Sequence, residues 1–273
     1  MNYILIDTSY LIFYRYFALM QWWGFSKPPE EHLINPAENI EFREKFKKAI
    51  IDSVENIKHM LKLHTNKRQS PPVKVIMARD CPRKNIWRNE YYDGYKATRE
   101  KDDNFMGGEF FKMTYQEKLL EQTGCDLIIQ EPKLEADDII AITTNYLKSL
   151  KDTEKIYIVA NDMDYLQLWD NKCDIINLKK QRLIENKKSF PDGAKNLFVK
   201  IILGDKSDNI MPVFKKCGVK EAEEMYNDIT GKKLENKLSR DNAYERLLLN
   251  KILVDFDEIP DYYIDRVLKK IKL

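Results

Sequence analysis

The stretch that decides the fold is EADDIIAITTNYLKSLKDTEKIYIVANDMD, residues 135–164. It places five carboxylates at the ends of two regular elements, an apolar helical run and a strand-like run. On a helix that begins near Glu135, residues three apart share a face, so the side chains of Glu135 and Asp138 should point the same way. Asp162 and Asp164 follow a buried strand, which is where parallel α/β sheets bind ligands. Because carboxylates at this density repel each other, we expect them to bind a hard cation such as Mg²⁺ or Mn²⁺.

Four further apolar runs of strand length flank this stretch, at residues 2–6, 73–78, 127–130 and 173–178. Segments with helical periodicity separate them, and this alternation predicts an α/β fold with a mostly parallel sheet and helices on both faces. Three of the strands are followed within two residues by an aspartate: Asp7, Asp80 and Asp162. Since the carboxyl ends of parallel strands share one sheet edge, we expect a pocket of about five to seven carboxylates there. Two divalent ions about 4 Å apart would relieve their repulsion.

Composition narrows the class of protein. The 273 residues allow one large domain or two moderate ones, and the hydrophobic fraction of 43% is enough for a packed core. Charged residues make up 33% with a formal net charge of +2, so a site for a polyanion must come from local segregation of charge. Four widely spaced cysteines without a CxxC argue against a zinc site or a disulfide framework. With no signal peptide or transmembrane run, we expect an intracellular protein, in cytoplasm or nucleus, without a membrane partner.

Two segments carry positive charge in patterns that suit nucleic acid. Residues 81–101 interleave basic side chains with aromatic rings, as a channel for single strands would, although a solvated loop can have the same composition. From Lys195 onward only helical patterns occur, and a basic turn containing Lys215 and Lys216 lies between two of the helices. Backbone N–H groups and lysines at such a turn can bind a run of phosphates.

Taken together, these segments resemble one known family, the flap endonucleases or structure-specific 5′ nucleases of phages, bacterial 5′–3′ exonucleases and eukaryotic repair. Order and spacing agree along nearly the whole chain. The matching motifs are Ile4-Leu5-Ile6-Asp7, the strand end at Asp80, Tyr95-Lys96-Ala97-Thr98-Arg99, Glu135-Ala136-Asp137-Asp138, Asn161-Asp162-Met163-Asp164 and Gly204-Asp205-Lys206-Ser207-Asp208-Asn209-Ile210.

The resemblance implies an architecture. We expect a PIN-like nuclease core over residues 1–195, with a central, mostly parallel sheet flanked by helices. An arch or clamp over the site would lie at 83–118. A helical C-terminal region would follow at 196–273 and contain a helix-hairpin-helix element at about 198–228 that grips duplex DNA.

The resemblance also implies roles for single residues. The first metal would be served, in part through water, by Asp7, Asp80, Glu135, Asp137, Asp138 and Asp162. The second would be served by Asp162, Asp164, Asp205 and Asp208. Lys96 and Arg99 match the basic pair that reaches from the arch onto the scissile phosphate. Further DNA contacts are expected from Arg83, Arg88, Tyr95, Lys206, Lys215, Lys216, Gly218 and Lys220. The cofactor would be two Mg²⁺ ions, for which Mn²⁺ substitutes.

Two departures from the family pattern matter. The family hairpin reads close to Pro-Gly-Val-x-Gly-Ile-Gly-x-Lys-Thr-Ala, whereas residues 212–222 keep only Gly218 of its three glycines. Because glycine permits close backbone approach and positive φ, this loss argues against the K⁺ site that such a turn can form. We expect no polymerase domain after the nuclease region and no clamp-binding tail after Ile271. The chain therefore resembles a stand-alone phage or viral enzyme, which we expect to act as a monomer on DNA with a 5′ flap or junction.

The expected activity is metal-dependent cleavage of DNA near a 5′ flap or 5′ end, leaving 5′-phosphate and 3′-hydroxyl ends in replication or repair. The balance of endonuclease and exonuclease cleavage stays open. A PIN-type ribonuclease is the nearest enzymatic alternative, and an inactive binder of DNA junctions is another. A phosphatase of the haloacid dehalogenase type would need Asp-x-Asp after its first strand, where this chain has Asp7-Thr8-Ser9.

Overall fold

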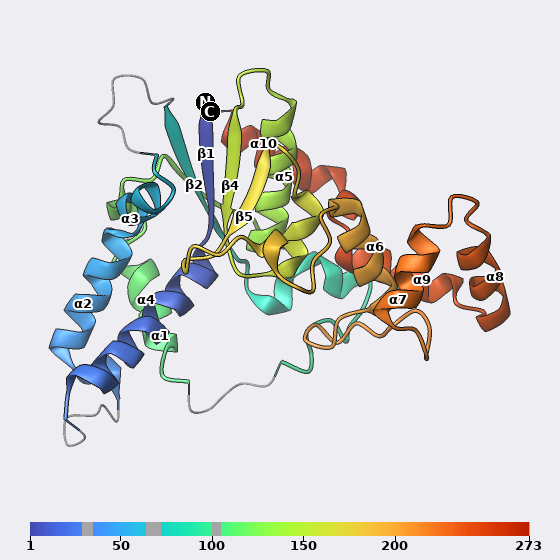
Figure 1. Ribbon diagram of the computed structural model, residues 1–273. Helices are drawn as coiled ribbons and strands as arrows, with labels where there is room; N and C mark the ends of the chain where they lie inside the picture. The colour runs from blue at the N-terminus through green and yellow to red at the C-terminus, as the bar shows by residue number, and fades with distance from the viewer. Residues whose placement is uncertain (29–34, 64–71, 100–104, 273) are drawn as a thin grey trace.

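One parallel sheet forms the centre of the molecule (Figure 1). The computed structural model describes residues 1–28, 35–63, 72–99 and 105–272. The strand order is β3-β2-β1-β4-β5, and all four pairings are parallel. The strands are β1 (Asn2–Asp7), β2 (Val73–Arg79), β3 (Leu127–Gln130), β4 (Lys155–Val159) and β5 (Cys173–Ile176). The α/β class predicted from the alternation of strands and helices is confirmed.

The register brings the ends of the three middle strands to one edge. Ile6 of β1 lies opposite Met77 of β2 on one side and Val159 of β4 on the other. Asp7 is the last residue of β1, Asp80 directly follows β2, and Asp162 lies three residues after the end of β4. The segments that follow β1, β2 and β4 therefore begin side by side at one edge of the sheet.

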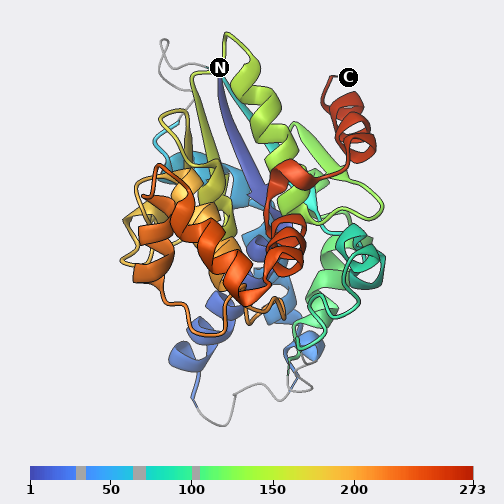
Figure 2. The same ribbon diagram turned by 90° about the vertical axis from the view of Figure 1, so that its right-hand side faces the viewer.

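Helices cover both faces of the sheet because successive strand residues point to opposite sides. Ile4 and Ile6 face one helical layer, whereas Tyr3 and Leu5 face the other. The first layer contains α1 (Thr8–Ser26), α2 (Ile40–Ile51), α3 (Ser53–Met60) and α4 (Gly108–Gln116). The second contains α5 (Ala136–Ser149) and α10 (Asp261–Ile271), and Figure 2 shows α10 beside α5.

A group of helices extends from one side of the sheet (Figure 1). It consists of α6 (Gly193–Leu203), α7 (Val219–Tyr226), α8 (Lys232–Asp241) and α9 (Tyr244–Val254). Helix α6 packs on α7 and α9, and residues 204–218 join α6 to α7. The chain then returns to the sheet, where Phe256, Ile259 and Val267 join the core under α5. The predicted division at residue 195 and the predicted hairpin remain predictions.

The segment expected to form an arch, residues 83–118, contains short 3-10 helices, turns and one α-helix where the structure describes it. Residues 83–99 contain two short 3-10 helices followed by turns, α4 begins at Gly108, and 100–104 lie outside the described residues. The 3-10 helices of the chain are η2 (Pro36–Glu38), η3 (Arg83–Asn85), η4 (Trp87–Glu90), η5 (Glu121–Thr123), η6 (Met163–Leu168), η7 (Leu183–Glu185) and η8 (Phe256–Glu258). Within the described ranges, no helix has both the length and the apolar character to cross a membrane.

Candidate metal centre

Acidic residues from distant parts of the chain border one cavity at the carboxyl edge of the sheet. Asp7, Asp80 and Asp162 follow β1, β2 and β4, and Glu135 and Asp137 lie at the start of α5. The cavity has a volume of about 420 Å³. Its lining also includes Ser9, Tyr10, Phe13, Cys81, Arg83, Ile86, Lys96, Arg99, Asn161 and Tyr165.

The first two aspartates are held in place by hydrogen bonds. Asp7 caps α1, since its Oδ1 accepts from the backbone N–H of Tyr10 at 2.9 Å. Its Oδ2 accepts from the hydroxyl of Tyr165 at 3.1 Å. Asp80 accepts from the backbone N–H of Ala136 at 2.8 Å and from the hydroxyl of Ser9. These bonds link three chain segments around the cavity.

The start of α5 is a capping box. Asp138 Oδ2 accepts from the backbone N–H of Glu135 at 3.0 Å, and the Glu135 carboxylate caps the helix in return. Trp87 Nε1 donates to the same Asp138 oxygen at 3.1 Å, and Tyr95 donates its hydroxyl to Glu135 Oε2 at 3.0 Å. Asp138 is therefore fully buried, and it faces the protein rather than the cavity.

The chain supplies its own cations to part of the carboxylate set. Four basic side chains, Arg88, Lys96, Arg99 and Lys200, form ion pairs with acidic residues predicted to bind metal. Lys96 Nζ contacts Glu135 and lies 3.7 Å from Asp208 Oδ2, and Arg99 contacts the other oxygen of Asp208, Oδ1. The sequence argument, which attributed the neutralisation of these carboxylates to divalent ions alone, did not foresee these ion pairs.

A similar ion pair occupies the second acidic group. Lys200, on α6, contacts Asp164 and lies 2.7 Å from Asp205 Oδ2. One oxygen each of Asp164, Asp205 and Asp208 lies within 4.8 Å of the others, close enough to share an ion. The same holds for Glu135, Asp137 and Asp138. A cation in the second group would compete with the Lys200 ammonium.

Four carboxylates border the site without a basic partner. Within the described parts of the chain, Asp7, Asp80, Asp137 and Asp162 form no ion pair. The first three of these carboxylates come from three different segments, and every ligand atom that the four offer is an oxygen. Such a donor set fits a hard divalent ion such as Mg²⁺ or Mn²⁺ and does not fit a thiophilic one.

Burial and mutual repulsion change the acidity of this set. Burial raises the pKa of Asp7 to about 7, and the charge of Asp80 adds to the shift. Burial likewise raises the pKa of Glu135 to about 8, with Asp137 adding and Lys96 opposing. Asp205 differs, since Lys200 and Ser207 outweigh its burial and hold its pKa at about 2. Binding of a cation at Asp7 and Glu135 would therefore release protons near neutral pH.

Two residues predicted to bind DNA are not on the surface. Arg88 is 1% exposed, and its Nη1 lies 2.8 Å from Asp138 Oδ1. Tyr95 is 5% exposed and bonded to Glu135. Both predictions are wrong, because the two side chains are buried and bind the carboxylates Asp138 and Glu135 inside the protein. Arg83 is exposed and borders the cavity, and the other predicted contacts, Lys206, Lys215, Lys216, Gly218 and Lys220, are exposed on the C-terminal helical region.

Sequence reasoning missed several side chains that position the site: Ser9, Trp87, Tyr165 and Lys200. Only weak signals were available for them. Tyr165 directly follows Asp164, and Lys200 precedes Asp205 by little more than one helical turn. An aromatic residue or a lysine at such positions is common in helices, so its role appears only once the elements are packed.

Comparison with known proteins gives the family and the fold. The family model described as 5′-3′ exonuclease, N-terminal resolvase-like domain, matches residues 2–192. DNA polymerase I of Streptococcus pneumoniae serotype 4 is 28% identical over 259 residues, covering 82% of this chain but only 28% of the polymerase. The 5′-3′ exonuclease of Buchnera aphidicola subsp. Schizaphis graminum is 26% identical over 225 residues, covering 80% of this chain and 67% of that protein.

A solved structure covers the chain from end to end. The bacteriophage T5 flap endonuclease, in a pseudo-enzyme–product complex with DNA and metal ions, has a TM-score of 0.66, 17% identity and 100% coverage of both chains. At this identity the likeness establishes a shared fold, which is the expected PIN-like α/β architecture. Since the family model matches well over half of the residues, the chain belongs to the family of 5′-3′ exonuclease N-terminal resolvase-like domains.

Proposed function

We propose that this chain is a metal-dependent 5′ nuclease that hydrolyses DNA phosphodiesters near a 5′ flap or 5′ end. One observation carries the proposal: Asp7, Asp80 and Asp162, from three strands, border a single cavity together with Lys96 and Arg99. The site thus combines oxygen ligands for metal with cations for phosphate. The family description, a relative named 5′-3′ exonuclease and the DNA complex of the phage T5 enzyme support this reaction class.

The proposed cofactor is a pair of Mg²⁺ ions, for which Mn²⁺ can substitute. The unpaired carboxylates Asp7, Asp80, Asp137 and Asp162 would hold the first ion, and the group around Asp164 the second. When bound, such ions supply a hydroxide nucleophile and stabilise the leaving 3′ oxygen. The products would carry a 5′-phosphate and a 3′-hydroxyl.

Lys96 and Arg99 would bind the phosphate that reacts. Both are held at the cavity by carboxylates, Lys96 by Glu135 and Asp208, and Arg99 by Asp208. A phosphodiester in the cavity offers a competing anion, and metal at the carboxylates would weaken the existing ion pairs. The two cations could then turn to the phosphate and offset the charge that develops in the transition state. The enzyme would act as a monomer in intracellular DNA replication or repair.

The test is cleavage of 5′-labelled flap DNA with Mg²⁺, followed by mapping of the products. We expect wild-type protein to cut near the junction, and Asp162→Asn and Asp80→Asn to lose most activity. Asp265→Asn, on the exposed face of α10, is the matched control and should cut like wild type. Retained cleavage by both site variants would refute the proposal. Faster cleavage of a flap with an RNA arm would favour the PIN-type ribonuclease, and binding without any cleavage would favour the inactive junction binder.

A further inference from the structure

Asn161 lies where three neighbouring cavities meet. It directly precedes Asp162 at the carboxyl end of β4, and it borders the carboxylate cavity. It also borders a cavity of about 430 Å³ against α1 and another of about 440 Å³ against residues 177–186, which follow β5. Because Asn161 is exposed, a ligand in the carboxylate cavity has access to it.

Asn177, in the turn after β5, determines which end of the Asn161 side chain is free. Asn177 Oδ1 accepts from the backbone N–H groups of Lys179 and Gln181, each at 3.0 Å. Since a backbone N–H only donates, the other end of the Asn177 carboxamide must be its NH2 group. That group donates to Asn161 Oδ1 at 3.1 Å and to Gln181 Oε1 at 3.0 Å, which uses both of its hydrogens. Asn161 therefore turns its oxygen to Asn177 and keeps its own NH2 group for another partner.

The network that orients Asn161 is fixed. Asn177 is 6% exposed, and a flipped carboxamide would set its NH2 group against two backbone N–H donors. The turn is closed by the bridge between Ile176 and Arg182. The NH2 group of Asn161, in contrast, has no hydrogen-bond partner in the part of the chain that the structure describes. An oriented donor without a partner thus lies beside Asp162, which would hold the first ion.

The chemistry of this donor selects a phosphate. A metal ion does not fit it, because an amide NH2 group offers no lone pair to a cation. The non-bridging oxygens of a phosphodiester only accept hydrogen bonds, and asparagine is among the side chains that contact nucleic-acid phosphates. Lys96 and Arg99 are already paired with carboxylates, whereas Asn161 is neutral and can donate without giving up an ion pair.

We propose that Asn161 donates from its NH2 group to one phosphate of the strand bound in the carboxylate cavity, and that Asn177 is the positioning residue that orients this donor. The inference rests on the proposed nuclease function, which supplies the strand. It places a phosphate contact on the side of the cavity formed by β4 and β5, on other elements than Lys96 and Arg99. The contact should be specific to one phosphate, because such a hydrogen bond needs a donor–acceptor distance of about 3 Å.

Replacing single phosphates tests the inference. Fluorescence anisotropy in Ca²⁺ would measure the Kd of flap DNA in which one phosphate at a time, around the expected cleavage position, is a methylphosphonate. We expect one position at which the replacement weakens binding by wild type about tenfold more than binding by Asn161→Ala. Asn161→Ala should itself bind unmodified flap DNA about tenfold more weakly, because both changes remove the same hydrogen bond.

Three further variants separate a phosphate contact from a structural role. Asn161→Asp keeps the acceptor for Asn177 but loses the donor, so it should bind flap DNA no more tightly than Asn161→Ala. Asn177→Ala should weaken binding in wild type but add nothing in the Asn161→Ala background. Asn171→Ala is the control and should bind like wild type, because Asn171 is exposed and precedes β5, at the opposite edge of the sheet.

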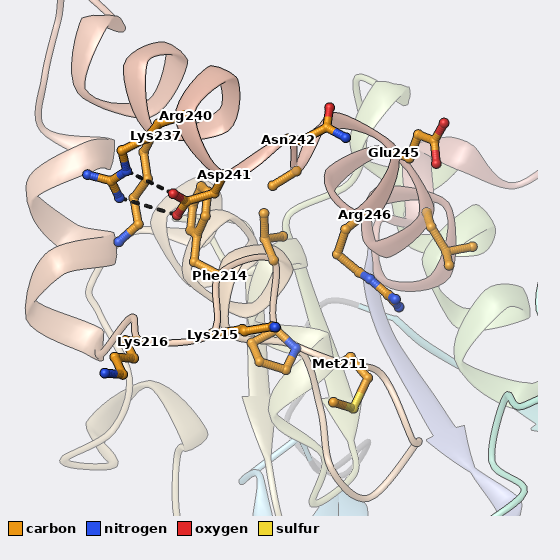
Figure 3. A pocket seen from close by; sticks show the side chains of 14 residues that line it. Met211, Phe214, Lys215, Lys216, Lys237, Arg240, Asp241, Asn242, Glu245 and Arg246 are labelled. Carbon is orange, nitrogen blue, oxygen red and sulfur yellow. Dashed lines mark hydrogen bonds and ion pairs between the residues drawn. The ribbon is translucent and has the colours of Figure 1, made fainter.

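Arg246 provides a comparison with a cation outside the site. Figure 3 shows it between the loop after Met211 and α9, in a cavity that shares no lining residue with the carboxylate cavity. Whatever its effect on overall affinity, Arg246→Ala should keep the wild-type response to every methylphosphonate around the cleavage position.

Two results would overturn the inference. One is that Asn161→Ala responds to every methylphosphonate as wild type does, and the other is that Asn161→Asp binds flap DNA like wild type. Either would reduce the bond between Asn161 and Asn177 to a link between β4 and the turn after β5. Failure of the nuclease function is distinguishable, because wild type would then leave flap DNA uncut in Mg²⁺ while its response to methylphosphonate still depended on Asn161.

Discussion

The guanidinium Nη1 of Arg88 lies 2.8 Å from Asp138 Oδ1, and both side chains are buried behind the carboxylate cavity. The same nitrogen is 3.4 Å from Glu135 Oε2, and Arg88 Nε donates to the backbone carbonyl of Leu253 at 2.9 Å. One arginine thus connects the start of α5, which carries the acidic residues, to the end of α9. Its charge compensates two buried carboxylates, those of Asp138 and Glu135.

Removing that charge should destabilise the protein strongly. Arg88→Met would leave Asp138 buried without its partner, and breaking a buried pair on one side costs about 3–5 kcal/mol. Urea unfolding of the metal-free protein measures the loss of free energy. Arg83→Met, at an exposed position in the same segment, should change stability by no more than about 0.5 kcal/mol. Equal stability of the two variants would contradict this account of Arg88.

Lys96 should affect chemistry more than binding. Its side chain borders the cavity, where its ammonium is held by Glu135 and Asp208. We expect Lys96→Ala to lower kcat on flap DNA by roughly 10²-fold, the effect of removing one preorganised donor, with a small change in KM. Lys84→Ala, an exposed neighbour, should behave like wild type. A loss of duplex affinity as large as the loss of rate would instead give Lys96 a docking role.

The metal-free protein should become more stable as the pH falls toward 5. Burial, and then nearby carboxylates, raise the pKa of Asp7 and of Asp164 to about 7. An acid with a raised folded pKa holds its proton more tightly in the folded state, so stability is lost as pH rises from about 4 to about 7. We expect the Tm in EDTA to fall between pH 5.5 and 8, and saturating Mg²⁺ to reverse that fall.

Asp7→Asn provides the control for this pH dependence. The variant removes one of the titrating groups, so its Tm in EDTA should depend less on pH. Identical slopes with and without Mg²⁺, in wild type, would show that these carboxylates do not bind the ion.

Tyr165 should raise the affinity for metal through its hydrogen bond to Asp7, without itself being a ligand of the ion. Its buried hydroxyl donates to Asp7 Oδ2 at 3.1 Å and fixes the orientation of that carboxylate. We expect Tyr165→Phe to weaken Mn²⁺ binding, measured by calorimetry, by about tenfold, as other losses of a hydrogen bond to a metal ligand do. Tyr226→Phe is the matched control, because its hydroxyl bonds to Asp192 on the C-terminal helical region. Equal affinities in the two variants would contradict the role assigned to Tyr165.

The edge of the sheet could be predicted because its signal is local. Each middle strand is a short apolar run that ends in an aspartate, and parallel pairing then brings Asp7, Asp80 and Asp162 to one side. The bounds of helix α8 could not be predicted, since its only apolar residues are Leu234 and Leu238, and two positions are too few to define a helical period.

The orientation of side chains in residues 81–99 could not be read from the sequence. Basic and aromatic residues alternate there, and composition does not say which of them face the solvent. Arg83 is exposed whereas Arg88 is buried, and the difference arises from tertiary contacts with α5 and α9. The ion pairs within the carboxylate set were missed for the same reason, because Lys200, for example, meets Asp164 only once α6 is packed.

The return of the chain to the sheet after α9 limits how the molecule can be divided. Phe256, Ile259 and Val267 cover the apolar side of α5, although they lie beyond the region that defines the family, residues 2–192. Cutting the chain after that region would uncover apolar surface on α5, which packs on α10 and η8, and would remove the carbonyl that accepts from Arg88. Residues 2–192 are thus not a self-contained folding unit, and we expect a fusion enzyme built from them alone to aggregate.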